Sequence, residues 1–216
     1  MGDSHSVSIS FLEYRTITLL AYNIHGEFRM NDPELFIQEK AGEITYKVIV
    51  IGDPAIGKTS LIRKYVKHQF EKDYIPTVGV SISKEPITLK IGGKSIQINL
   101  LLWDLAGQPQ FFLLHKVYFN GANGVLLGFD LTRTHTYSNC KEWHKELVKN
   151  GLSSCPIVLF GNKSDLKEER KVTKAHIDYM REQLDLKDYI ETSAINGSNV
   201  DLLFETIAKR IYERRM

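Results

Sequence analysis

Cysteine is scarce in this chain, because only two of its 216 residues, Cys140 and Cys155, carry a thiol. Their separation matches no metal-binding or redox spacing, and so few thiols favour a reducing compartment. Long apolar runs are also lacking, since none approaches the roughly 18 residues that a membrane-spanning helix needs. The chain does not open with a basic and then apolar secretion signal. We therefore expect a cytoplasmic protein.

A strong charge of one sign is absent as well. The formal net charge is +2, which is too small to indicate binding to nucleic acid or to an anionic membrane. The basic residues near the C-terminal end complement the dipole of a final helix, and a peripheral membrane role would need more of them. We expect no nucleic-acid partner, with a location peripheral to membranes kept as an alternative.

Signals for lipid attachment are few. The C-terminal stretch Glu213–Met216 contains no cysteine, so we expect no C-terminal prenyl anchor. Met1–Ser6 matches the loose pattern for N-myristoylation, with Gly second and Ser sixth. That pattern is short, and the acidic third residue disfavours it. N-terminal myristoylation stays open only as an alternative.

The residues that are present have the composition of a globular protein, 43% apolar and 25% charged. This length suits one filled core plus an extension, which we place at residues 44–216 and 1–43. The extension is too apolar for a disordered tail. Its pattern predicts strands at Val7–Phe11 and Thr16–Tyr22 and a short helix from Asp32 to near Gly42. We expect it to pack on the main domain, with a regulatory or partner-binding element as the alternative.

Apolar strands alternate with amphipathic helices through residues 44–216. The predicted strands are Ile44–Ile51, Val80–Ile91, Ser95–Trp103, Gly124–Asp130, Pro156–Phe160 and Tyr189–Glu191, and the predicted helices lie around Leu61–Val66 and at Thr136–Lys149, Thr173–Leu184 and Asn199–Arg215. Gly92-Gly93 is a tight hairpin signal, so the second and third strands should be antiparallel. This alternation predicts an α/β fold: a mostly parallel six-stranded sheet with one antiparallel edge strand and helices on both faces.

The stretch Gly52–Ser60 has the pattern of a phosphate-binding loop. It follows a buried strand and precedes a helix, which is the context that this motif requires. Helix N-termini attract phosphate, because their N–H groups are unpaired and carry partial positive charge. Gly52 and Gly57 let the backbone approach the anion, Lys58 adds a full positive charge, and Thr59 offers a hydroxyl to magnesium.

Asp104 ends the apolar strand that follows the hairpin. A carboxylate at the end of a strand can hold magnesium, usually through its water shell. Aspartate often stands there only to form a turn, but Gly107 close behind favours the functional interpretation, because a glycine amide can approach a terminal phosphate.

Asn162–Asp165 follows another buried strand and indicates which base is bound. The Asp165 carboxylate can accept hydrogen bonds from the ring N–H and the exocyclic amine of guanine. Adenine has an acceptor on that edge, so such a site would reject it by roughly 10⁴ or more. The stem of Lys163 can lie over the base, Asn162 would tie the loop to its neighbours, and the Ala194 N–H after the last strand could read the guanine carbonyl.

Together these segments resemble the Ras superfamily of small GTPases, and Rab proteins most of all. The matching stretches are Gly52–Ser60, Tyr74–Gly79, Trp103–Gln108, Asn162–Asp165 and Glu191–Ala194, within Glu43–Arg215. The resemblance implies a P-loop NTPase G domain that binds GTP and GDP with Mg²⁺ and hydrolyses GTP slowly. It also implies a monomeric molecular switch in vesicle trafficking, with an exchange factor, an activating protein and effectors as partners.

The resemblance implies roles for single residues. Thr77 would bind Mg²⁺ while the γ-phosphate is present, alongside Thr59 and Asp104, and Gln108 would orient the attacking water with Lys58 as the second catalytic group. Phe70 would pack against guanine, and Gly107 would bond the γ-phosphate. The implied nucleotide contacts are Ala55, Ile56, Gly57, Lys58, Thr59, Ser60, Phe70, Thr77, Gly107, Asn162, Lys163, Asp165, Ser193, Ala194 and Ile195.

The chain departs from this family at several positions. Pro54 stands where related proteins have Gly or Ser; it has no N–H for the phosphates, and its ring fills the path of a partner's arginine. Pro109 biases Gln108 away from helical angles, Ile195 replaces a common Lys, and Phe111–Leu114 is unusually apolar. We expect those apolar side chains to pack on the neighbouring helix, with an exposed partner-binding patch as the alternative.

Two other functions remain to be compared with a GTP-hydrolysing switch. One is a guanine-nucleotide-binding interaction module with little or no hydrolysis; Gln108 favours catalysis, whereas Pro54 and Pro109 would impair it. The other is a P-loop kinase that uses ATP, which Asp165 and the lack of an arginine-rich lid disfavour. No Arg lies between Glu71 and Gly79 to act as an internal arginine finger, so intrinsic hydrolysis should be slow.

Overall fold

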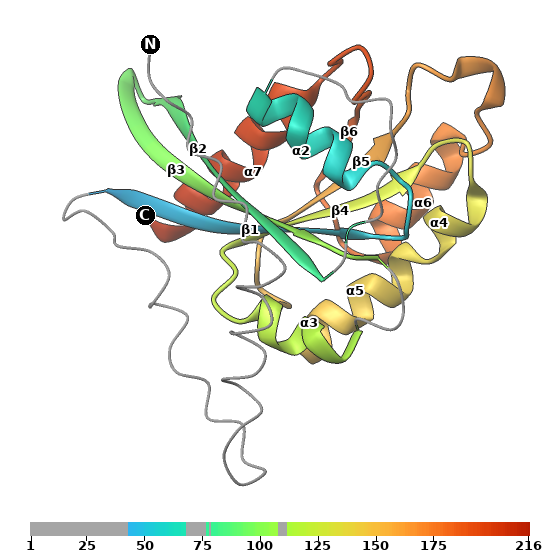
Figure 1. The fold of residues 1–216 in the computed structure, drawn as a ribbon, viewed down its shortest axis with the longest axis horizontal. Helices are drawn as coiled ribbons and strands as arrows, with labels where there is room; N and C mark the ends of the chain where they lie inside the picture. Colours follow the sequence, from blue (N-terminus) through green and yellow to red (C-terminus); the bar gives the residue numbers. More distant parts are fainter. Residues whose placement is uncertain (1–42, 68–76, 78, 108–111) are drawn as a thin grey trace, which may run out of the picture.

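The computed structural model describes residues 43–67, 77, 79–107 and 112–216. In this part the chain forms a six-stranded sheet in the order β2-β3-β1-β4-β5-β6 (Figure 1). β2 pairs antiparallel with β3, and the other neighbouring pairs are parallel. The strands are β1 (Ile44–Gly52), β2 (Val80–Ile91), β3 (Lys94–Leu105), β4 (Gly124–Asp130), β5 (Ile157–Asn162) and β6 (Asp188–Glu191). The predicted mostly parallel sheet with one antiparallel edge strand is confirmed.

Helices cover both faces of this sheet (Figure 1). Alternate side chains of a strand point to opposite faces, so Val48 and Val50 of β1 join one core while Ile49 and Ile51 join the other. α2 (Lys58–Lys67) and α7 (Val200–Arg215) cover the first core, and α3 (Phe112–Phe119), α4 (Thr134–Ser138), α5 (Cys140–Lys149) and α6 (Lys174–Gln183) cover the second. The helices therefore enclose the central strands β1, β4 and β5 on both sides.

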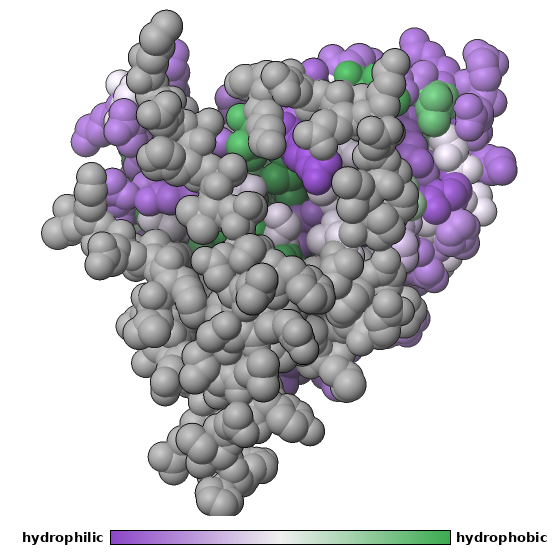
Figure 2. Space-filling model, in the orientation of Figure 1, coloured by the Kyte–Doolittle hydropathy of each residue, from purple (hydrophilic) through white to green (hydrophobic). Residues whose placement is uncertain are grey.

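The outer surface of the molecule near α4 and α6 is largely hydrophilic (Figure 2). α6 turns Ile177 and Met180 into the core and leaves its polar residues in solvent. Among the described residues, no helix combines the length and the apolar character that crossing a bilayer requires.

Two predicted boundaries differ from the structure. The helix predicted at Thr136–Lys149 is two helices, α4 and α5, which meet at Asn139. Asn139 keeps helical angles (φ −68°, ψ −14°), so the break is slight. Asp104 was expected just after its strand but lies inside β3, because the pairing with β2 continues from Ser81–Asp104 to Val80–Leu105.

Residues 1–42 lie outside the described residues, and so do the strands and helix predicted within them. The domain boundary at residues 43 and 44 therefore stays a prediction. The packing expected of Phe111–Leu114 stays a prediction as well.

The centre of the sheet is packed tightly around two glycines, Gly52 and Gly128. Gly52 at the end of β1 pairs with Gly128 of β4, and Gly128 pairs with Phe160 of β5. A Cβ added at Gly128 would overlap the Phe160 ring, and one at Gly52 would overlap the Gly128 carbonyl. The loop after β1 therefore starts directly against the core, which fixes its position.

This packing predicts that Gly128→Ala lowers the free energy of unfolding by about 1–3 kcal/mol, the usual cost of overpacking a filled core. Urea unfolding followed by circular dichroism would measure the loss. Adding Phe160→Leu should return part of the stability, since it makes room for the new methyl group. Fully additive losses in the double variant would contradict the overlap with Phe160.

Candidate functional site

The loop between β1 and α2 runs from Asp53 to Gly57 at the carboxyl end of the central strand. Its glycines take conformations that disfavour other residues, with φ +137° at Gly52 and +96° at Gly57. A Cβ on Gly57 would overlap the Asn162 amide. Ala55 also has a positive φ, +58°, although it carries a Cβ. The loop is thus held in a tight and partly strained shape, as an enclosing anion site requires.

Lys58 points back into this loop. Its side chain is buried, and its Nζ donates to the Gly52 carbonyl at 2.7 Å and to the Asp53 carbonyl at 3.0 Å. Burial lowers the pKa of Lys58 to about 8, although the nearby Asp104 and Asp53 carboxylates act in the opposite direction. The loop therefore encloses an ammonium group whose natural counter-charge would be a bound anion.

Three oxygen-bearing side chains meet beside Lys58. The Thr59 hydroxyl lies 2.6 Å from the Thr77 hydroxyl and donates to Asp104 Oδ2, while Thr77 Oγ1 lies 3.3 Å from the same carboxylate oxygen. Burial raises the pKa of Asp104, and Lys58 and the two threonine hydroxyls oppose that rise. Its Oδ1 is buried and has no hydrogen-bond partner among the described residues. Such a cluster of hard oxygen donors with a spare carboxylate oxygen fits Mg²⁺.

Gly107 lies directly against the loop between β1 and α2, residues Asp53 to Gly57, which we call the phosphate-type loop. A Cβ at this position would lie 2.7 Å from both the Asp53 carbonyl carbon and the Pro54 nitrogen. No other residue could bring its backbone so close to the loop, which is the proximity that its predicted role requires. Gln108 and Phe70 lie outside the described residues, so their predicted roles stay predictions.

The loop after β5 is joined to its neighbours at both ends, as predicted for Asn162. The Asn162 Nδ2 donates to the Ile56 carbonyl at 2.8 Å, and its Oδ1 accepts from the Thr192 hydroxyl at 3.2 Å. Asp165 accepts a hydrogen bond from Ser193 Oγ. The structure therefore brings the predicted base-reading carboxylate and the residues after β6 together.

The remaining residues predicted to contact the nucleotide, Ser193, Ala194 and Ile195, lie in the segment after β6. Ser193 and Ala194 are buried, whereas Ile195 is exposed. Thr192 N–H donates to the Gly161 carbonyl, and the Thr192 carbonyl accepts from Ser164 N–H. Ser193 therefore joins this segment to Asp165, with the buried Ala194 and the exposed Ile195 following it in the chain.

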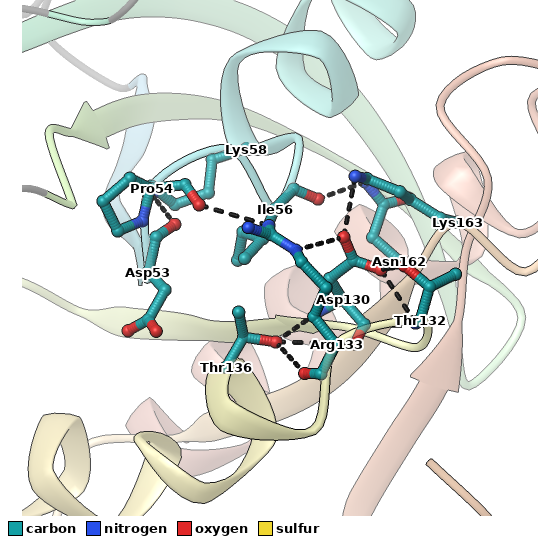
Figure 3. A network of polar contacts seen from close by, with 10 residues as sticks. All are labelled: Asp53, Pro54, Ile56, Lys58, Asp130, Thr132, Arg133, Thr136, Asn162 and Lys163. Carbon is teal, nitrogen blue, oxygen red and sulfur yellow. Dashed lines mark hydrogen bonds and ion pairs between the residues drawn. The ribbon is translucent and has the colours of Figure 1, made fainter. Parts of the chain in front are cut away.

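The sequence analysis missed Asp130, a buried carboxylate at the end of β4 (Figure 3). Its Oδ2 accepts from Lys163 Nζ at 2.7 Å and from Arg133 Nε at 2.8 Å. Its Oδ1 accepts the N–H and hydroxyl of Thr132. Burial would raise the pKa of Asp130, but these hydrogen bonds outweigh it and hold the pKa below its usual value. One signal was available in the sequence, because Asp130 follows an apolar run of strand residues, as Asp104 does.

Asp53 was missed as a functional residue too. Its carboxylate accepts from Asn139 Nδ2 at 2.8 Å and from Trp143 Nε1 at 2.9 Å. Asn139 lies at the junction of α4 and α5 and Trp143 lies in the first turn of α5, so this carboxylate attaches the phosphate-type loop to these helices. Nothing in the sequence near Asp53 marks these two partners, because Asn139 lies 86 residues away along the chain and Trp143 lies 90 residues away.

The parts of this site occur together in one class of protein. A glycine-bounded loop between a central strand and a helix, a buried lysine, and an aspartate on the neighbouring strand define a P-loop nucleotide-binding domain. The strand order places these parts near the carboxyl ends of the parallel strands, where such domains bind their ligands.

Comparison with known proteins identifies the family. The model of the Ras family matches residues 47–213. The human Ras-related protein Rab-25 is 35% identical over 176 residues, covering 82% of this chain and 80% of the relative. The yeast Ras-related protein SEC4 is 34% identical over 175 residues, covering 81% and 79%, and RABA5a of Arabidopsis thaliana is 35% identical over 174, covering 81% and 76%. The chain belongs to the Ras family and is a Rab-like small GTPase, a hydrolase of GTP.

The position of Asp165 generates a test of base recognition. We expect Asp165→Asn to shift the preference from guanine toward xanthine nucleotides, because a carboxamide donates where xanthine has a carbonyl. Competition of GDP and xanthosine diphosphate against a fluorescent GDP would measure the preference. Asp178→Asn, on the exposed side of α6, is the control. An unchanged preference in the Asp165 variant would count against this role.

Proposed function

We propose that this Rab-like GTPase binds GTP and GDP with Mg²⁺ in the corner formed by the loops after β1, β3, β5 and β6. Lys58 and the backbone of Ala55–Ser60 hold the phosphates, and Asp165 reads guanine with Ala194 beside it. The observation that carries this proposal is the convergence of Thr59, Thr77 and Asp104 next to the buried Lys58. Nothing in the comparisons favours the alternative of a module that binds the nucleotide without hydrolysis.

Mg²⁺ is the cation that these three side chains would hold. When bound, it would neutralise charge on the phosphate chain. Thr77 is the only one of the three that belongs to the loop before β2, whereas Thr59 and Asp104 belong to α2 and β3. A ligand that recruits Thr77 therefore links that loop to the phosphate site, and loss of the terminal phosphate would release it.

Gln108 is the residue that we expect to orient the attacking water. It follows Gly107, whose backbone lies against the phosphate-type loop, and this proximity supports the proposed role. The chain supplies no arginine from the loop before β2. Slow intrinsic hydrolysis is the expected consequence, with an activating protein, an exchange factor and effectors as partners.

The residue-level proposal predicts the outcome of a single-turnover experiment. Protein loaded with GTP and magnesium should convert bound GTP to GDP over hours, and Gln108→Leu should slow this conversion by about tenfold or more without weakening GTP binding. Chromatography of the bound nucleotide measures both species.

Gln183→Leu at the exposed end of α6 is the matched control and should hydrolyse at the wild-type rate. A wild-type rate in the Gln108 variant would mean that another group orients the water. Intact GTP in the wild type would favour the module that binds without hydrolysis, or a switch that depends wholly on a partner.

A further inference from the structure

Arg133 contacts the outer side of the phosphate-type loop (Figure 3). It precedes α4, and its guanidinium bridges two parts of the site. Nε donates to Asp130 Oδ2 at 2.8 Å, and Nη2 donates to the Pro54 carbonyl at 3.2 Å. An arginine can make both bonds at once because its N–H groups form a rigid, planar fork.

Several hydrogen bonds fix Asp130, the carboxylate to which Arg133 is bonded, and the backbone of Arg133 itself. Asp130 is fully buried, and Thr132 and Lys163 fix its carboxylate from other directions. The Thr136 hydroxyl donates to the Arg133 carbonyl at 2.7 Å. The guanidinium therefore reaches Pro54 from a fixed base, and the bond positions the loop more than it positions the arginine.

The bond to the Pro54 carbonyl determines where the next amide points. The described residues contain no cis peptide bond, and in a trans peptide the C=O and the following N–H point in opposite directions. When Arg133 holds the Pro54 carbonyl on the α4 side, the Ala55 N–H faces the opposite side of the loop. Asn162 makes the equivalent bond to the Ile56 carbonyl, which directs the Gly57 N–H in the same manner.

Two residues of the loop, Pro54 and Ala55, make the bond between Arg133 and the Pro54 carbonyl important in this chain. Pro54 has no N–H, so the loop offers one amide fewer to a phosphate chain. Ala55 has φ +58°, a conformation that is costly for a residue with a Cβ. An external contact is therefore needed to keep the peptide between Pro54 and Ala55 in this orientation.

We propose that Arg133 is a positioning residue that orients the Ala55 amide toward the nucleotide phosphates and offsets the amide that Pro54 lacks. This inference rests on the proposed nucleotide site. Arg133 acts through the Pro54 carbonyl and makes no contact of its own with the nucleotide.

The test uses the full chain with bound GDP and Mg²⁺ and compares Arg133→Met with Arg210→Met. Arg210 is a suitable control, because it also donates through Nε and Nη2, in its case both to Asp188 at 2.8 Å each, between α7 and β6. Phosphorus NMR reports the environment of the GDP phosphates, and chase of a fluorescent GDP reports its release. We expect Arg133→Met to shift the phosphate resonances and to speed release about tenfold, the effect of losing one charge-assisted hydrogen bond.

Arg210→Met should change neither reading. Arg133→Lys keeps the charge, but one ammonium cannot bond to Asp130 and Pro54 in the arginine's geometry, so it should give a smaller shift in the same direction. Wild-type resonances and release in whichever Arg133 variant folds would overturn the inference. Wild-type protein that retains no GDP after gel filtration would instead refute the nucleotide site itself, so that measurement comes first.

Discussion

The Asp130 carboxylate is the contact on which the geometry of the site depends. It is fully buried, and two cationic side chains from different loops share one of its oxygens. A buried charge of this kind is tolerated only when every direction is paired, and Thr132 completes the set. Lys163 brings in the loop after β5, and Arg133 brings in the loop after β1. These bonds thereby link the predicted phosphate site to the predicted base site.

Close packing sets the second constraint. Gly52 and Gly107 lie where backbones meet, and Gly128 lies against the Phe160 ring, so a methyl group at any of them would overlap a neighbour. The phosphate-type loop can therefore move little relative to β1, β3 and β4. Its outer carbonyls are bonded to side chains from other elements, so both its position and the direction of its peptides are set by the fold.

Much of this could be predicted from sequence, because the informative patterns are local. The hairpin glycines, the strand and helix alternation and the loop after β1 each occupy a few consecutive residues. The contacts that were missed join distant residues: Arg133 lies 79 positions from Pro54 in the sequence, and Trp143 lies 90 positions from Asp53. No periodicity encodes such a pair. The end of β3 could not be predicted from nearby residues either, because only the pairing with β2 shows that the strand continues past Asp104.

Pro54 and Arg133 are best understood together. In the nucleotide site that we propose, Pro54 would offer the phosphates no amide, and its ring would stand at the entrance that a partner's arginine would use. Arg133 stands beside that same residue and is anchored from within the fold by Asp130. The loop would thus lack one donor and an open entrance, and the chain's own guanidinium would hold its shape. Under this proposal, nucleotide retention would depend on the bond between Arg133 and the loop, whereas stimulation by an outside arginine would depend on access past Pro54. The two properties would then be controlled by different sides of a single residue.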